Sequence, residues 1–280
     1  MRIRNHKLVG DGGRNVPYLQ TPNGGAGITG DTPRILVIHY TAGASMSGAV
    51  NWFRNPDAKA SAHLVVGRDG AITQMQPFDK VCWHAGKSRW KNIKGLNSHS
   101  VGIEIANWGK LKPSASGGWL SWTNAPVPNE NVVLAAHRNH PGQTHGWEAF
   151  EEAAFMATVA ASQAIVAEYG IGPNDVVGHE DISPGRKVDP GPAFDMDKFR
   201  ALVFGRDADE WDDLKYKVRS NSGLNMRDGP GVNFNKIKNL ADNTVVNVID
   251  RDGVWWLVAE IVDGEDNTTG YVHSRWLQPH

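Results

Sequence analysis

Residues 34–40 read RILVIHY, a nearly continuous run of apolar and mostly β-branched side chains. Such a run is typical of a strand that is buried on both faces of a sheet, as in parallel α/β proteins. The sequence AGA at residues 42–44 ends the run, so we expect His39 at the end of a buried strand. Open α/β sheets bind ligands at their strand ends. This stretch therefore predicts an α/β fold and the position of a site.

The segments on either side supply the other elements of a mixed central β-sheet flanked by helices. They are recognised by apolar periodicity, capping residues and turn signals. In chain order we expect a helix that begins after Ser45 or Ser47, a hairpin around RDG at residues 68–70, a strand at 101–106, a long amphipathic helix at 147–169 that Gly170 ends, a strand at 176–178 and a closing helix at 197–204.

The chain of 280 residues is long enough for a medium-sized domain and a second small one. Residues 1–33 are polar and Gly-rich, which predicts an irregular arm lying on a domain at residues 34–206. Residues 110–130 predict a long surface loop within that domain. After a charged boundary at residues 205–213, short β-rich runs at residues 214–280 predict a small all-β barrel.

The composition argues against several classes of function. The chain has 29 Lys and Arg against 30 Asp and Glu with no long charged run, so electrostatics indicate no nucleic-acid partner. Cys82 is the only cysteine, which excludes an intramolecular disulfide, and we expect it to be a small buried residue. No apolar run approaches the roughly 20 residues of a membrane helix, so we expect no membrane insertion.

A second stretch, GHEDISPGRKVDPG at residues 178–191, is dense in groups that bind metal or carry charge. Its Pro and Gly residues predict a loop that is neither a helix interior nor a regular strand. A solvated turn with exposed charges would have the same composition. We interpret His179 and Asp189 as two ligands of one zinc ion, with His39 as the third ligand and Lys187 beside them.

Two imidazoles and one carboxylate leave a fourth zinc position open, which is the pattern of a catalytic site. A zinc-bound water has a pKa near 7 and becomes a nucleophile. Glu104 lies mid-strand among apolar neighbours and is the candidate for the base that takes the proton of this water. The ammonium of Lys187 could stabilise the oxyanion that forms when the water attacks a carbonyl.

Other hydrolase schemes do not fit. A zincin requires His-Glu-x-x-His on a helix, but Ser183 stands where the second His would be. The chain has no Gly-x-Ser-x-Gly elbow of a serine hydrolase. The flanks of Cys82 are not those of a cysteine protease.

Five motifs together resemble those of a known family, and they occur in its order across roughly residues 30–204. They are IHYT at 38–41, SAHL at 61–64, WHAG at 83–86, Asn97 with SVGIE at 100–104, and the stretch at 178–191. The chain thus resembles the zinc-dependent N-acetylmuramoyl-L-alanine amidases of type 2, the family that includes the peptidoglycan recognition proteins. Residues 214–280, which begin with GLNMRDGPG at 223–231, resemble a bacterial SH3-type domain.

The resemblance implies a zinc hydrolase that cleaves the amide between N-acetylmuramic acid and L-alanine of the stem peptide. The matching positions are His39, His179 and Asp189 for zinc, Glu104 for the catalytic base, Lys187 for transition-state assistance, and His63, His84, Asn97 and Trp83 for substrate binding. The implied partners are peptidoglycan or muropeptides. We expect a monomer whose SH3-type domain binds the cell wall.

A non-catalytic peptidoglycan receptor is the alternative function. Such receptors usually lack one metal ligand, whereas this chain has all three candidate ligands. The start of the chain has no Sec signal peptide, so we expect synthesis in the cytoplasm. Action on the cell wall would then follow lysis or export by a non-Sec route. A recycling enzyme, a phage lysin and an exported effector all remain open.

Overall fold

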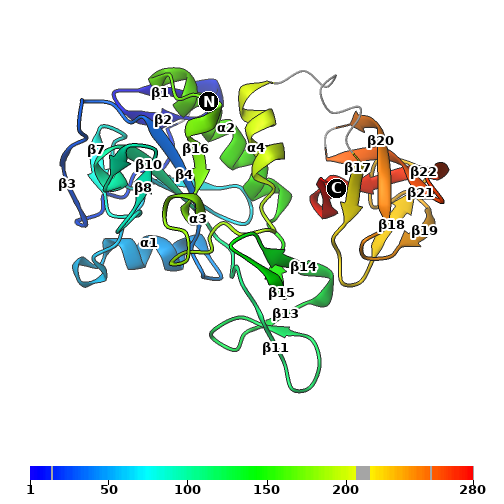
Figure 1. Cartoon of the computed structure of the whole chain (residues 1–280). Helices are drawn as coiled ribbons and strands as arrows, with labels where there is room; N and C mark the ends of the chain where they lie inside the picture. Colours follow the sequence, from blue (N-terminus) through cyan, green and yellow to red (C-terminus); the bar gives the residue numbers. More distant parts are fainter. Residues whose placement is uncertain (14, 206–214, 253, 280) are drawn as a thin grey trace. The chain divides into compact units, whose positions relative to one another are not determined.

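The computed structural model describes residues 1–13, 15–205, 215–252 and 254–279. The chain divides into two compact units (Figure 1). The first unit consists of Met1–Gly109, His137–Pro141 and Phe150–Gly205, and the second of Lys110–Ala136, Gly142–Ala149 and Arg206–His280. Two segments that we expected within the larger domain therefore group with the C-terminal residues. Apart from Gly205, the boundary predicted at residues 205–213 lies outside the described residues.

The first unit is built around a five-stranded mixed sheet in the order β16-β4-β10-β5-β6. Neighbours pair in parallel except β5 and β6, which form the predicted antiparallel hairpin. The strands are β16 (Val176–Gly178), β4 (Ile35–Tyr40), β10 (Ser100–Ile105), β5 (Leu64–Val66) and β6 (Ile72–Gln74). The predicted α/β fold class is confirmed, because the apolar runs are long enough to be buried on both faces.

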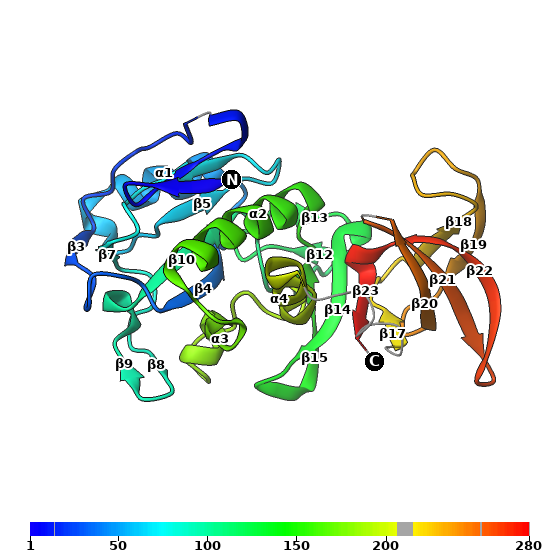
Figure 2. The same ribbon diagram turned by 90° about the horizontal axis from the view of Figure 1, so that it is seen from above.

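Helices cover both faces of this sheet (Figures 1 and 2). The helices α2 (Glu152–Tyr169) and α4 (Met196–Phe204) pack with Leu36, Ile38 and Ile103 in the main core. On the opposite face α1 (Met46–Arg54) buries Val50 and Phe53 against Val65. The predicted cap Ser45 accepts a hydrogen bond from the Gly48 N–H. Among the described residues, no helix combines the length and apolar character needed to cross a membrane.

The long helix begins at Glu152, five residues later than predicted, while its end at Gly170 is confirmed by a left-handed φ of 65°. Trp147 instead belongs to β15 (His140–Glu148), where it is buried and its indole N–H donates to the Ala135 carbonyl. The helical pattern was wrong for these residues because packing of this one large side chain outweighs local propensity.

Two further expectations were wrong because both segments contain more β-structure than their sequences indicated. The N-terminal arm is not irregular, because β1 (Arg2–Arg4) pairs with β2 (Lys7–Val9) and β3 (Gly24–Gly27) pairs with β7 (Lys80–Cys82). Leu8 in this arm is buried in the main core. The expected loop at 110–130 contains a three-stranded sheet of β11 (Lys112–Pro113), β12 (Trp119–Leu120) and β13 (Pro126–Val127). The local sequence of both segments gives little indication of β-strands. The strands form because these segments pair with other parts of the chain and are buried.

The C-terminal residues of the second unit form a seven-stranded antiparallel sheet in the order β19-β18-β22-β21-β20-β17-β23. Its core includes Tyr216, Val218, Met226 and Trp256. The predicted all-β fold is confirmed. The strands are β17 (Lys215–Val218), β18 (Leu224–Arg227), β19 (Lys236–Leu240), β20 (Val245–Asp252), β21 (Trp255–Val262), β22 (Glu265–His273) and β23 (Leu277–Pro279).

The remaining elements of the described residues are short. They are β8 (Arg89–Trp90), β9 (Ile93–Lys94), β14 (Val132–His137), which forms a two-stranded sheet with β15, and α3 (His179–Ile182). The last of these is a correction, because the stretch at 178–191 was expected to be free of helix. Its first turn forms because the Asp181 carboxylate accepts a hydrogen bond from the Gly178 N–H.

Candidate functional site

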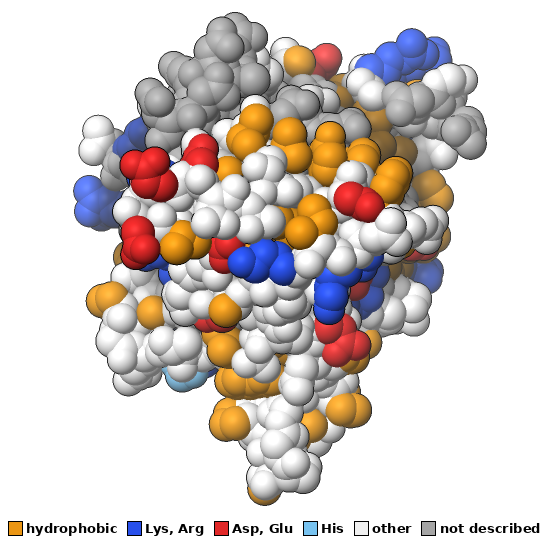
Figure 3. Space-filling view, turned by 90° about the vertical axis from the view of Figure 1, so that its right-hand side faces the viewer, with side chains coloured by type: hydrophobic (Ala, Val, Ile, Leu, Met, Phe, Trp, Pro, Cys, Tyr) orange, Lys and Arg blue, Asp and Glu red, His pale blue; other side chains and the backbone are white. Residues whose placement is uncertain are grey.

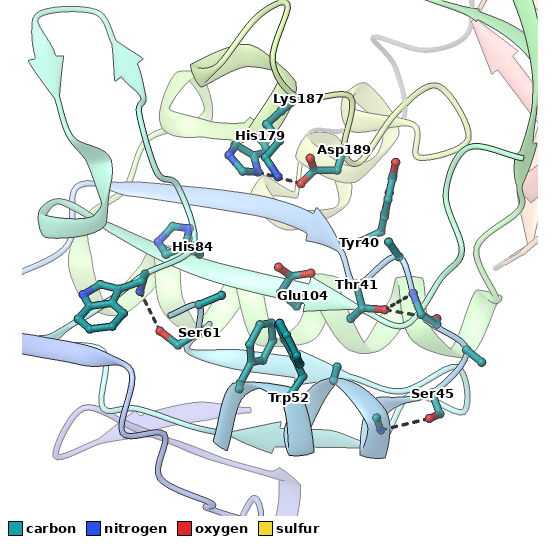
Figure 4. Close-up of a pocket in the computed structure, with 18 of the residues that line it drawn as sticks. Tyr40, Thr41, Ser45, Trp52, Ser61, His84, Glu104, His179, Lys187 and Asp189 are labelled. Atoms are coloured by element: carbon teal, nitrogen blue, oxygen red, sulfur yellow. Dashed lines mark hydrogen bonds and ion pairs between the residues drawn. The ribbon is translucent and has the colours of Figure 1, made fainter. Parts of the chain in front are cut away.

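Two buried histidines from neighbouring strand ends and one buried aspartate from the following loop meet at one point. Figure 4 shows two of the three, His179 and Asp189. His39 lies near the end of β4, and His179 begins α3 directly after β16. Parallel pairing aligns Gly178 with Ile38, which brings His179 beside His39. The two Nδ1 atoms lie 2.9 Å apart, and Asp189 Oδ2 is 2.9 Å from His39 Nδ1 and 3.0 Å from His179 Nδ1.

This cluster could hold a metal ion, since its three ligand atoms all lie within 4.8 Å of one another. Two imidazole nitrogens and one carboxylate oxygen form a donor set that suits divalent transition metals. Burial, assisted by His179, lowers the pKa of His39 to about 4, so its imidazole is neutral at pH 7. The pKa of Asp189 lies below its usual value although burial opposes this shift, so its carboxyl is ionised at pH 7. These are the protonation states that metal ligation requires.

Glu104 reaches the same place from the adjacent strand. The register of β10 on β4 pairs Glu104 with His39, so both side chains leave the same face of the sheet. Burial and the nearby Asp189 charge raise the pKa of Glu104 well above its usual value, while Lys187 opposes this shift. Its Oε2 atom is buried and has no hydrogen-bond partner among the described residues. This carboxylate is therefore open to a water or a ligand.

Two members of the cluster, His179 and Asp189, line a cavity of about 540 Å³ in the first unit together with Glu104, and His39 lies buried beside them. Figure 4 shows Glu104 projecting between the Asp189 loop and α1. Lys187 lies on the loop side of this cavity, whereas Trp52 lies on the α1 side. An apolar platform facing a charged wall can accommodate a ligand that has both kinds of surface.

The four residues predicted to contact substrate separate into two groups. Trp83 and His84 line the cavity, and Trp83 is 38% exposed. His63 does not line it: this residue is buried, its Nε2 donates to the Lys80 carbonyl at 2.8 Å, and its Nδ1 accepts from the Gly102 N–H at 3.1 Å. With both ring nitrogens used by the backbone, His63 is corrected to a residue that joins the strands.

Asn97 also lies outside the cavity lining and needs the same correction. Its Oδ1 accepts hydrogen bonds from the N–H groups of His84, at 3.1 Å, and Ala85, at 2.7 Å. It therefore holds the turn that carries His84. Cys82 is buried as expected, and burial raises the pKa of its thiol to about 12, which makes it a poor nucleophile.

Sequence reasoning assigned no role to several residues that the structure brings to the site. Trp52, Tyr40 and Arg186 line the cavity. The Arg186 Nη2 atom lies 2.9 Å from the Ala85 carbonyl, so it ties the stretch at 178–191 to the WHAG turn. Arg186 directly precedes Lys187 in the sequence. This position was the one local feature that could have indicated a place for Arg186 in the site. Nothing local marks Trp52, because an aromatic residue on a helix usually packs in a core.

The closeness of the sheet to His84 gives a testable consequence. A Cβ added at Gly102 would lie 2.5 Å from His84 Cγ, a distance that real contacts do not reach. We expect Gly102→Ala to displace this ring and to lower the free energy of unfolding by about 1–3 kcal/mol, as overpacking typically does. Thermal unfolding would measure the loss. Gly172→Ala is the control, since its added Cβ meets nothing within 4 Å. Equal stability of the two variants would contradict this packing.

Comparison with known proteins shows which family this chain belongs to. The family model described as N-acetylmuramoyl-L-alanine amidase matches residues 29–192. The chain belongs to this amidase family. A second model, described as bacterial SH3 domain, matches residues 222–278. The matched ranges contain the whole metal-ligand cluster and most of the C-terminal sheet, so the resemblance to type 2 amidases with an SH3-type domain is confirmed.

Individual amidases are similar over part of their length. The chain is 32% identical over 145 residues to the 1,6-anhydro-N-acetylmuramyl-L-alanine amidase AmpD of Salmonella typhimurium, covering 52% of this chain and 58% of that protein. It is 33% identical over 168 residues to the N-acetylmuramoyl-L-alanine amidase AmiD of Escherichia coli, covering 58% and 50%. A crystal structure of a selenomethionine AmpD derivative aligns with a TM-score of 0.49 at 25% identity, covering 72% and 99%.

Proposed function

We propose that this amidase-family chain is a zinc-dependent hydrolase of peptidoglycan. Its reaction would cleave the amide between N-acetylmuramic acid and the L-alanine of the stem peptide. The observation that carries the proposal is the convergence of His39, His179 and Asp189 at a cavity that the unpartnered carboxylate of Glu104 also lines. The named relatives AmpD and AmiD, which are both muramoyl-L-alanine amidases, support the choice of bond.

Zinc is the metal we propose, because two imidazoles and a carboxylate with an open fourth position form its usual catalytic set. When bound, zinc supplies a polarised water near neutral pH and a Lewis acid for the scissile carbonyl. His39, His179 and Asp189 would hold the ion.

Glu104 would move the proton in this reaction. Its raised pKa suits a group that first takes a proton from the attacking water and then gives it to the leaving amine of L-alanine. Lys187 lies near enough to influence the pKa of Glu104, and its ammonium would stabilise the negative oxygen of the tetrahedral intermediate. Trp83 and Trp52 on the cavity wall would contact the sugar and the peptide.

The proposal predicts a metal-dependent release of stem peptide. Incubation of the zinc-loaded protein, expected to act as a monomer, with soluble muramyl peptides should give free peptide, detected by mass spectrometry. Treatment with a chelator should abolish the release, and added Zn²⁺ should restore it. Metal-replete protein that binds muramyl peptides without cleaving them would support the receptor alternative instead. Cleavage at a glycosidic bond would contradict the proposed reaction.

We also propose that the SH3-type domain binds the cell wall. The second unit exposes the apolar side chains of Val232, Phe234 and Ile249, which are 69%, 47% and 48% exposed. Figure 3 shows hydrophobic side chains gathered on one face of the molecule. Where such side chains form one contiguous patch, they commonly mark a binding surface.

Shortening the chain to residues 1–205 tests this role. The cavity residues all lie within that range, so hydrolysis of soluble muramyl peptides should be retained. Co-sedimentation with insoluble sacculi should fall, because the second binding surface is lost. Unchanged sedimentation of the shortened chain would contradict a wall-binding role for the SH3-type domain.

A further inference from the structure

The turn with the sequence WHAG at residues 83–86 contacts both imidazoles of the cluster on the Nε2 side of each ring. His84 Nδ1 lies 3.0 Å from His39 Nε2, and the Ala85 carbonyl oxygen lies 3.2 Å from His179 Nε2. In each ring this is the nitrogen opposite to the Nδ1 atom that faces the cluster. One short turn therefore touches the outer nitrogen of both candidate ligands.

The direction of the hydrogen bond between His84 and His39 follows from Ser100. The single hydroxyl hydrogen of Ser100 is donated to the Leu96 carbonyl at 2.6 Å. Its oxygen lies 3.2 Å from His84 Nε2 and can only accept there, so His84 Nε2 carries a hydrogen. A neutral imidazole carries a single ring hydrogen, so the Nδ1 atom of neutral His84 is a lone pair.

The hydrogen bond from His39 to His84 determines which ring nitrogen of His39 carries the hydrogen. Because His84 Nδ1 accepts, His39 Nε2 must donate to it. A neutral imidazole carries only one ring hydrogen, so His39 Nδ1 is left with a lone pair. This lone pair points at His179 Nδ1 and Asp189 Oδ2, each at 2.9 Å.

His179 is set in the same sense by the next residue of the turn. The Ala85 carbonyl can only accept, so the contact at 3.2 Å requires a hydrogen on His179 Nε2. Arg186 Nη2 also lies 3.3 Å from this nitrogen, but it lies closer to the carbonyls of Ala85 and Lys87 and to Ser183 Oγ, at 2.9, 2.9 and 2.7 Å. Its two hydrogens are engaged there, so they do not compete.

We propose that His84 is a positioning residue and that the WHAG turn presets both imidazoles with Nδ1 lone pairs directed at the metal site. The inference rests on the proposed metal site. Asn97 holds the turn through its bonds to the His84 and Ala85 N–H groups. Three lone pairs brought within 3.0 Å of one another repel unless a cation lies between them. The hydrogen-bond chain therefore favours metal binding without a prior proton shift.

Variants at His84 separate this role from simple packing. His84→Asn keeps an amide oxygen at the place of Nδ1, which can accept from His39, whereas His84→Leu fills similar space and cannot accept. Competition titration with a zinc chelator should give the weakest Zn²⁺ binding for Leu, by roughly 10–100-fold, with Asn in between. Zn²⁺ binding by the Leu variant equal to or tighter than that of the Asn variant would overturn the proposal.

Ser100→Ala tests the same chain one step further away. It removes the acceptor for His84 Nε2–H, and we expect about a 10-fold loss of Zn²⁺ affinity. Ser162→Ala is the matched control, since Ser162 is equally buried, lies on α2 and has no hydrogen-bond partner for its hydroxyl among the described residues. Unchanged Zn²⁺ affinity in Ser100→Ala, with thermal unfolding like that of the control, would overturn the proposal.

A direct readout is the tautomer in metal-free protein. Long-range proton–nitrogen NMR spectra distinguish a protonated from a bare ring nitrogen. His39 and His179 should both carry the hydrogen on Nε2 in the wild-type chain, and His39 should lose this preference in Ser100→Ala. Hydrogen on Nδ1 of either wild-type ring would overturn the inference, whatever the activity. Failure of the wild-type protein to bind Zn²⁺ would instead overturn the proposed function. The inference about His84 would then lose the metal site on which it rests.

Discussion

His179→Ala is expected to abolish peptide release and to lower bound zinc far below one ion per chain. The imidazole of His179 is one of three candidate ligands that the described part of the chain brings together, and its removal leaves His39 Nδ1 and Asp189 Oδ2 as a two-ligand site. Without the ion the attacking water keeps its ordinary pKa and is a poor nucleophile at pH 7. Metal analysis after dialysis and mass-spectrometric assay of muramyl peptides would measure both effects.

Loss of folding must be separated from loss of metal in this experiment. His140→Ala is the control, because His140 is an exposed histidine of the same unit. Circular dichroism should show that both variants are folded, and only His179→Ala should lose zinc. A folded His179→Ala protein with one zinc per chain and wild-type turnover would contradict the metal site proposed for this chain.

Glu104→Gln has the second largest expected effect, and its character is different. The amide has the shape of the carboxylate but cannot take a proton, so the rate should fall by about 10²–10⁴, the usual contribution of a general base. Zinc content should stay at one ion per chain, because Glu104 is not part of the ligand cluster. Turnover numbers and metal analysis of the same samples would test both statements.

The control for this variant is Glu152→Gln. Glu152 is half-buried like Glu104 but lies at the start of α2, away from the cavity lining. It should keep the wild-type rate. Full activity in Glu104→Gln would remove Glu104 as the base, and loss of zinc in that variant would show that Glu104 helps to hold the metal.

Much of the fold could be predicted because its signals are local. The run at residues 34–40 is apolar throughout and becomes β4 with the predicted site at its end. The RDG hairpin and the Ser45 cap depend on turn and capping chemistry within a few residues, and both are confirmed. The misplaced start of α2 depends on Trp147, whose indole bonds the Ala135 carbonyl 12 positions earlier in the chain. The unpredicted strand β3 depends on pairing with β7, which lies far away in the sequence.

Some residues of the candidate site could likewise be predicted from the sequence and others could not. Ligand chemistry is carried by single side chains, so His39, His179, Asp189 and Glu104 could be proposed from residue type and element position. The structure brings the three candidate ligands together and pairs Glu104 with His39 on the adjacent strand. The roles of His63, His84 and Asn97 could not be read in this way. Each of them depends on which backbone group or ring lies opposite its polar atoms.

The sequence by itself determined the α/β and all-β organisation and the donor set of the metal site, because apolar periodicity and residue chemistry are encoded locally. Only the tertiary structure decided which ring nitrogens face the candidate metal site. The register between β4 and β10 brings Glu104 beside His39. Ser100 Oγ and the Ala85 carbonyl oxygen accept hydrogen bonds from His84 and His179, and these acceptors determine where the imidazole hydrogens lie. Hydrogen-bond direction is a property of partners that folding brings together, so residue order alone does not contain it.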